Sequence, residues 1–139
     1  MKRFAAVSLI CCVLAVMPIP SVHASDPSTD CNLDQGPCRS IAGNREIIFD
    51  ISPKPVEAMK EITFIVHVVS SDYAPALLLD LSMPGMHMGK NEVLLKKRPD
   101  GKYSGTGVIP RCPSGRKLWQ AEIDIPAAGK VSYRFNVAY

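Results

Sequence analysis

Three methionines and one histidine fall within six residues of this chain, in the segment Met83-Pro84-Gly85-Met86-His87-Met88. Only one other methionine follows residue 24. Thioether sulfur is soft and uncharged, and together with imidazole it suits Cu(I) better than Mg²⁺ or Ca²⁺. Pro84 and Gly85 break helices and central strands, so we expect the sulfurs on a turn between strands. One interpretation is therefore a site for Cu(I) or Ag(I), with Met83, Met86, His87 and Met88 as its ligands.

The same side chains could instead fill the end of a β domain or form an apolar contact surface, because methionine adapts to irregular gaps. In an extended chain Met86 and Met88 point to one side and His87 to the other, so a tight turn is needed to gather all four. Met59 is a further candidate sulfur, with plugging of the core as its alternative role. Cys112 could add a thiolate, which binds Cu(I) more tightly than a thioether does. Metal binding and structural packing both remain open.

The first residues have the pattern of a signal peptide. Lys2 and Arg3 precede an apolar run over 4–17, which is too short to span a bilayer, and small residues lead up to Ala24. We expect cleavage between Ala24 and Ser25, which leaves a periplasmic or secreted chain of 115 residues, 139 less 24. Two of the sixteen Lys and Arg residues would leave with the signal while all thirteen acids stay, so the formal charge would fall from +3 to +1. This balance indicates neither nucleic-acid binding nor a polybasic membrane anchor.

Three cysteines remain after cleavage: Cys31, Cys38 and Cys112. Disulfides form and persist in exported proteins, and three thiols allow one internal bridge at most. A local Cys31–Cys38 bridge would close a small loop, whereas a bridge from either residue to Cys112 would close a much longer one. Both pairings are open, with Cys112 a free thiol in the first. No Cys-x-x-Cys accompanies them, which disfavours a thiol–disulfide exchange role.

The mature chain has the size of one domain and consists of short apolar segments that alternate with Pro and Gly. We predict a leader over 25–42 and a domain over 43–139. Within the domain, strands are predicted at 44–51, 61–69, 76–82, 92–96, 102–109, 117–125 and 131–137. Seven short strands at this spacing predict an antiparallel, immunoglobulin-like β-sandwich. Trp119 is expected to be its largest core side chain.

Strand direction then predicts which loops meet. If consecutive strands are antiparallel, the connections after the first, third and fifth strands emerge at one end of the domain. Met59, the methionine segment and Cys112 should therefore share an end, whereas Cys31 and Cys38 should lie at the opposite one. His67 is expected on a sheet surface. The basic clusters at 96–98 and 116–117 are expected to keep strand ends soluble.

Several of these motifs resemble the YtkA-like domain family: Leu79-Asp80-Leu81-Ser82 continued through Met83 to Gly89, then Gly101-Lys102-Tyr103-Ser104-Gly105, then Cys112-Pro113-Ser114-Gly115 with Trp119. The resemblance covers about residues 43–139. The family comprises small exported bacterial β-sandwich proteins related in outline to the FixH group. It implies the same fold here and, from the methionines of some relatives, an association with copper. Unlike FixH-type members, this chain shows no apolar anchor segment after the expected signal.

The sequence does not indicate an enzyme. His67 and His87 are the histidines that would survive cleavage, and no serine, cysteine or paired carboxylate has an evident base beside it. No glycine-rich phosphate loop follows a strand and opens a helix. We therefore expect a monomeric binding or accessory module with no membrane span after cleavage. It either binds Cu(I) or docks to a partner protein of the cell envelope.

Overall fold

The computed structural model describes residues 31–69 and 74–139. The expected signal peptide over 1–24, its cleavage point between Ala24 and Ser25, and the first part of the leader lie outside the described residues. All regular elements within them are β-strands, which confirms the predicted all-β class. No helix capable of crossing a membrane occurs in residues 31–69 and 74–139.

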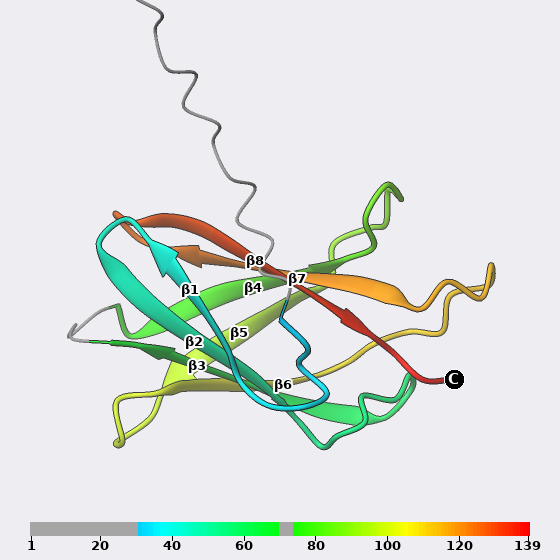
Figure 1. The fold of residues 1–139 in the computed structure, drawn as a ribbon, viewed down its shortest axis with the longest axis horizontal. Coiled ribbons are helices and arrows are strands. Elements are labelled where there is room, and N and C mark those ends of the chain that lie inside the picture. Colours follow the sequence, from blue (N-terminus) through cyan, green and yellow to red (C-terminus); the bar gives the residue numbers. More distant parts are fainter. Residues whose placement is uncertain (1–30, 70–73) are drawn as a thin grey trace, which may run out of the picture.

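Eight strands form one antiparallel sheet (Figure 1). They are β1 (Cys38–Ala42), β2 (Arg45–Ser52), β3 (Glu61–Val68), β4 (Ala76–Ser82), β5 (Glu92–Lys97), β6 (Tyr103–Val108), β7 (Leu118–Ile125) and β8 (Gly129–Asn136). Their order across the sheet is β1-β2-β3-β6-β5-β4-β7-β8. The seven predicted strands are all present, as β2 to β8, with ends within two residues of those expected. Because hydrogen bonds join all eight strands into one sheet, the immunoglobulin-like sandwich is not confirmed.

The predicted number of seven strands is wrong, because β1 lies within the segment expected to be a leader. Its inward-facing residues are Cys38, Ser40 and Ala42, which are small, while its one large apolar residue, Ile41, is 72% exposed. The strand therefore lacks the alternation of large apolar side chains that marks β2 to β8. It pairs with β2 through the two-residue turn at Gly43 and Asn44, where Gly43 takes a φ of +59°. Glycine suits that position because it adopts positive φ without a Cβ clash.

The two outer strands of the sheet, β1 and β8, approach each other and nearly close it into a barrel (Figure 1). Tyr133 on β8 bridges the approach. Its hydroxyl shares a hydrogen bond with the Ser40 hydroxyl and donates to the Ile47 carbonyl at 3.3 Å. Its ring stacks on Phe49 at a centroid distance of 4.7 Å. The buried Tyr133, whose hydroxyl has hydrogen-bond partners, thus joins β8 to β1 although no backbone hydrogen bonds pair these two strands.

The barrel interior contains the alternating apolar residues of every strand. Trp119, Phe49, Phe64 and Ile47 are fully buried, and Trp119 is the largest of the buried side chains, as predicted. Burial of each large apolar side chain contributes about 1.5–3 kcal/mol relative to leaving it exposed. This core holds the strands in register, and the strands in turn position the loops at each end.

One corner of the barrel is shaped by glycine. β5 and β6 share two residue pairs, Lys96 with Ser104 and Lys97 with Tyr103, and the part of β5 that precedes these pairs passes close to β6. A Cβ built on Gly105 would lie 2.6 Å from the Leu94 carbonyl oxygen, and one on Gly107 would lie 2.8 Å from the Val93 side chain. Glycine at these inward positions is what allows the close crossing.

Tyr133 makes the stability of the barrel sensitive to alkali. Burial raises the pKa of Tyr133 to about 12, although the hydrogen bond from Ser40 opposes the shift. The folded state therefore favours the neutral phenol, whose unfolded pKa is about 10. This stability is fully present below pH 10 and is lost as the pH rises through 12, with about 1.4 kcal/mol gone near pH 11. Urea unfolding at pH 8 and pH 11 should show this loss in the wild type and not in Tyr133→Phe. Equal losses in both proteins would contradict it.

Candidate functional site

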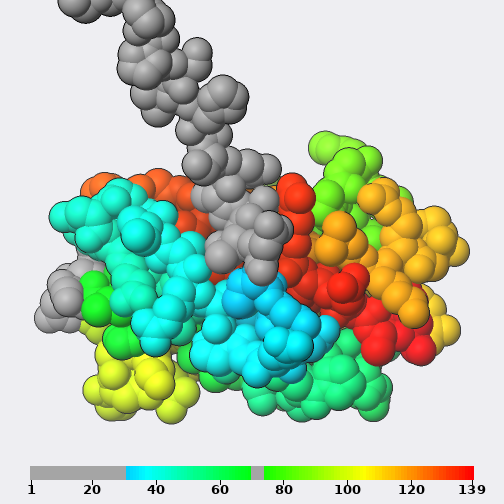
Figure 2. Space-filling model, in the orientation of Figure 1, coloured from blue at the N-terminus to red at the C-terminus, as the bar shows by residue number. Residues whose placement is uncertain are grey.

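Three loops gather at one end of the barrel, which we call the loop end: residues 53–60, 83–91 and 109–117 (Figure 1). Hydrogen bonds connect them. The Met59 amide donates to the Ile109 carbonyl at 2.9 Å, and the Arg116 guanidinium donates to the Pro84 carbonyl at 2.8 Å. In Figure 2 the lime surface of the second loop lies beside the gold and orange surface of the third. The prediction that Met59, the methionine segment and Cys112 share an end is therefore confirmed.

The methionine segment, residues 83–88, forms a tight turn that we call the sulfur turn. The Met86 amide donates to the Met83 carbonyl at 3.0 Å, and Gly85 takes a φ of +73°. Proline followed by glycine with positive φ is typical of a type II turn, which requires positive φ at its third residue. Met83 and Met86 are thereby paired as an antiparallel bridge. Residues paired in this way project their side chains to the same side, with Cβ atoms about 5 Å apart.

Burial within the sulfur turn alternates along the chain. Met83 is 1% exposed, Met86 and Met88 are partly buried against the core, and His87 is exposed. Met86 and Met88 both pack against the core, whereas His87 between them is exposed. The turn thus directs all three thioethers toward the barrel and the imidazole toward solvent.

Trp119 lies next to the sulfur turn on the neighbouring strand. β4 and β7 pair up to Ser82 with Gln120, and continuing this register by one residue sets Met83 opposite Trp119. Both side chains are buried in the core. The indole N–H is a buried donor without a hydrogen-bond partner among the described residues. The single tryptophan of the chain is therefore placed where it can report on the state of the turn.

Cys112 is a free, buried thiol on the third loop of the loop end. Its Sγ lies 3.0 Å from the Ser114 Oγ. The hydrogen bond from Ser114 lowers the pKa of Cys112, with smaller contributions from backbone amides and the Arg116 charge, while burial opposes the shift. The thiol thus lies in the loop that contacts the sulfur turn through Arg116.

The other two cysteines form the local bridge. Cys31 and Cys38 are disulfide-bonded with a Cα–Cα distance of 5.7 Å, which confirms that pairing and excludes a bridge to Cys112. The expectation that both lie at the end opposite Cys112 is wrong. β1 runs antiparallel to β2, so Cys38 lies opposite Phe49, in the half of β2 that leads to the loop end. The unpredicted strand is the cause of this difference.

Sequence reasoning missed two residues that order the loop end. Arg116 was expected only to keep a strand end soluble, yet its guanidinium binds the sulfur turn at Pro84. The Tyr139 hydroxyl donates a hydrogen bond to the Arg116 carbonyl and accepts one from the Cys112 amide at 3.4 Å. The Arg111 guanidinium lies over the Tyr139 ring, 5.7 Å from its centroid. The predicted strand directions already placed the loops 83–91 and 109–117 at the same end, and this could have indicated that Arg116 reaches the sulfur turn. No sequence pattern indicated Tyr139.

The loop end offers soft donors in preference to hard ones. Across residues 31–69 and 74–139, no three His, Cys, Asp or Glu side chains are grouped so that they could hold a metal ion. His67 is paired with Ile48 near the C-terminal end of β3, at the far end of that strand from the loop end, and Met59 is 66% exposed. The candidate site is therefore built from the three methionines of the sulfur turn, with the Cys112 thiol in the adjacent loop.

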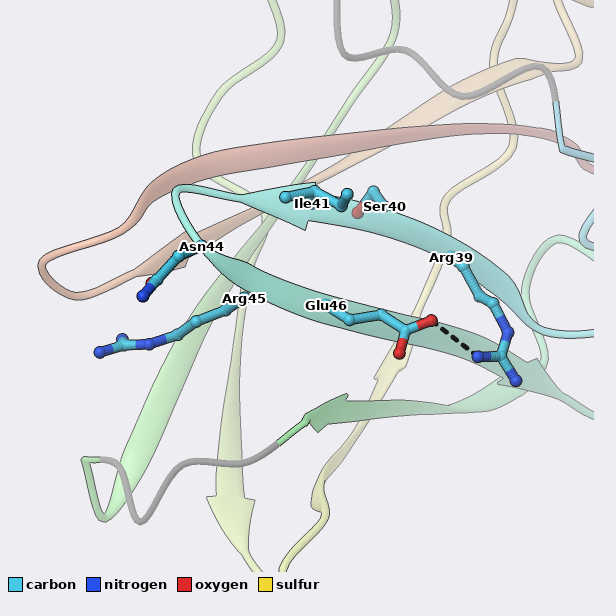
Figure 3. A pocket seen from close by; sticks show the side chains of 6 residues that line it. All are labelled: Arg39, Ser40, Ile41, Asn44, Arg45 and Glu46. Carbon is cyan, nitrogen blue, oxygen red and sulfur yellow. Dashed lines mark hydrogen bonds and ion pairs between the residues drawn. The ribbon is translucent and has the colours of Figure 1, made fainter.

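A separate hollow of about 520 Å³ lies on the β1–β2 hairpin (Figure 3), lined by Arg39, Ser40, Ile41, Asn44, Arg45 and Glu46. An ion pair between Arg39 and Glu46 at 2.7 Å crosses the hairpin. Both side chains are well exposed, so the pair contributes little to stability. None of the lining residues is a methionine, cysteine or histidine, so the hollow does not share the chemistry of the sulfur turn.

Comparison of the chain with protein-family models, with curated proteins and with solved structures gave no match.

Proposed function

We propose that this chain is an exported binding protein that takes up Cu(I) or Ag(I) through the thioethers of Met83, Met86 and Met88. The observation that carries the proposal is the paired turn, because it sets Met83 and Met86 on the same side and Met88 follows two residues later. Three neutral, soft donors on one side of a hydrogen-bonded turn suit a soft monovalent ion. We also propose membership of the YtkA-like family and a location in the cell envelope; the all-β fold and the Cys31–Cys38 disulfide are compatible with both.

The burial of the three methionines suggests how an ion would enter. Met86 and Met88 are partly exposed and would meet it first, and Met83 would form the inner wall. His87 projects away from this side, so we leave it out of the ligand set. Cys112 is not needed for a three-thioether site, although its thiolate would strengthen binding if the third loop shifted toward the turn.

The test is anaerobic titration with Cu(I) against a chromogenic Cu(I) chelator, and with Ag(I) followed by Trp119 fluorescence. We expect one ion per chain and a change in Trp119 emission, because the β4–β7 register, continued by one residue beyond Ser82, sets Met83 opposite Trp119. Met86→Ala with Met88→Ala should lower the affinity by at least about 100-fold, since loss of even an outer-shell partner of a metal site costs 10–100-fold.

The matched control is Met59→Ala, which removes an exposed methionine from the same end and should leave the affinity unchanged. Thioethers have no proton to lose, so affinity should be flat from pH 6 to pH 8. A rise with pH that disappears in Cys112→Ala would instead place the thiolate among the ligands. Undiminished uptake in the double variant would exclude the proposal.

A second candidate is docking to a partner protein of the cell envelope. Large apolar side chains are exposed around the loop end, with Met59 66%, Val108 47% and Leu118 38% exposed. Adaptable methionines beside such residues are typical of contact surfaces. This role predicts co-purification with one envelope protein that is lost in Met86→Lys, together with no uptake of Cu(I) or Ag(I) by the wild type.

A further inference from the structure

We propose that Arg116 is the positioning residue of the sulfur turn, holding Met83, Met86 and Met88 in one orientation before an ion binds. The inference rests on the proposed function for its metal-binding consequence and on the structure alone for the ordering of the turn. Arg116 would not touch the ion. It acts through the Pro84 carbonyl, at the centre of the turn.

The loop that contains the sulfur turn has two backbone hydrogen bonds of its own. At the base the Leu81 amide donates to the Asn91 carbonyl at 2.8 Å, and across the turn the Met86 amide donates to the Met83 carbonyl at 3.0 Å. Arg116 reaches the loop from outside, with its guanidinium 2.8 Å from the Pro84 oxygen. A charged donor makes this a stronger hydrogen bond than a neutral one would be. It fixes the direction of the turn relative to the third loop.

Arg116 can act as an anchor because its own backbone is braced. The Tyr139 hydroxyl donates to the Arg116 carbonyl and accepts the Cys112 amide. The Gly115 amide donates to the Cys112 carbonyl at 3.0 Å, and the Val137 amide donates to the Lys117 carbonyl at 2.9 Å. The guanidinium therefore extends from a loop that is bonded on both sides of residue 116. A connected set of bonds runs from the segment after β8 to the sulfur turn.

Order before binding matters for a site built from methionine. Each thioether lies at the end of a flexible side chain, and ordering such side chains on binding costs free energy. A turn held in advance removes the backbone share of that cost. Removal of the anchor should therefore weaken binding without removing any ligand atom.

The experiment compares Arg116→Gln with Lys117→Gln. Lys117 is the exposed neighbour, and its described bond is made by its backbone carbonyl rather than its side chain. In the metal-free protein, amide hydrogen exchange over residues 85–90 should quicken up to about tenfold in Arg116→Gln, the factor that loss of one hydrogen bond allows. Ag(I) affinity should fall by about tenfold, within the range for outer-shell partners of metal sites. Lys117→Gln should match the wild type in both measurements.

Arg116→Lys keeps a donor of the same charge and should restore part of both effects, which a loss of folding would not predict. Equal urea midpoints in all variants establish that the barrel is intact. Exchange and Ag(I) affinity in Arg116→Gln that stay within twofold of the wild type would overturn the inference. Faster exchange in Arg116→Gln, in a protein whose wild type takes up no Ag(I), would support the anchor and count against the proposed function instead.

Discussion

Replacement of Trp119 with alanine is expected to lower the free energy of unfolding by about 3–5 kcal/mol, the cost of deleting a large aromatic side chain from a core. Trp119 is 0% exposed and is the largest buried side chain of the barrel. Continuing the β4–β7 register by one residue beyond Ser82 sets Trp119 opposite Met83, so its loss would also remove a large side chain beside the sulfur turn. Urea unfolding followed by far-ultraviolet circular dichroism measures the change, because the variant has no tryptophan emission.

Leu118→Ala is the matched control on the same strand. Leu118 is 38% exposed, so its truncation should cost under about 1 kcal/mol. Trp119→Phe should lose less than Trp119→Ala, because it keeps a ring and also removes the unpartnered buried N–H. A loss below 1 kcal/mol in Trp119→Ala would show that the indole does not support the core.

Gly105→Ala is expected to destabilise the barrel by about 3 kcal/mol, at the upper end of the cost of overpacking. The added methyl group would lie 2.6 Å from the Leu94 carbonyl oxygen and 3.0 Å from side-chain atoms of Leu95 and Val93. A backbone oxygen cannot swing aside as a side chain can. β5 would have to move away from β6, at the corner where the two strands share only two residue pairs. Thermal or urea unfolding at neutral pH measures the loss.

Gly36→Ala provides the comparison, because a Cβ there meets no heavy atom within 4 Å and Gly36 has no positive φ. It should be neutral or stabilise by up to about 1 kcal/mol through the unfolded state. If Gly105→Ala proved as harmless as Gly36→Ala, the close crossing of β5 over β6 would be wrong.

Strands β2 to β8 could be predicted because each alternates large apolar and polar residues. Ile47, Phe49 and Ile51 in β2 and Val131, Tyr133 and Phe135 in β8 are buried as their spacing requires. Alternation reports burial on one face and carries no information on which strand lies beside which. The single nearly closed sheet depends on pairings such as β3 with β6, between residues far apart in the chain. β1 escaped prediction because a disulfide cysteine, a serine and an alanine face inward in it.

The sequence predicted which residues of the candidate site lie together, but it did not predict the residues that hold them in place. Strand direction brought Met59, Met83 and Cys112 to one end, and the two-residue period separated His87 from Met86 and Met88. The side chains of Arg116 and Tyr139 bind backbone carbonyls and amides. Almost every residue has these groups, so the partners of Arg116 and Tyr139 could not be predicted from residue types. Contacts of this kind become visible only in three dimensions.

The ladder between β5 and β6 is the shortest of the barrel. Two residue pairs join these strands, against six between β3 and β6 and five between β4 and β5. Loss of those two pairs would leave every other ladder intact. It would separate one group of strands, β1, β2, β3 and β6, from a second group, β5, β4, β7 and β8. Met83, Met86 and Met88, which follow β4, and Trp119 of β7 all belong to the second group. A local change at the β5–β6 ladder would therefore leave the methionines and Trp119 on one continuous set of paired strands.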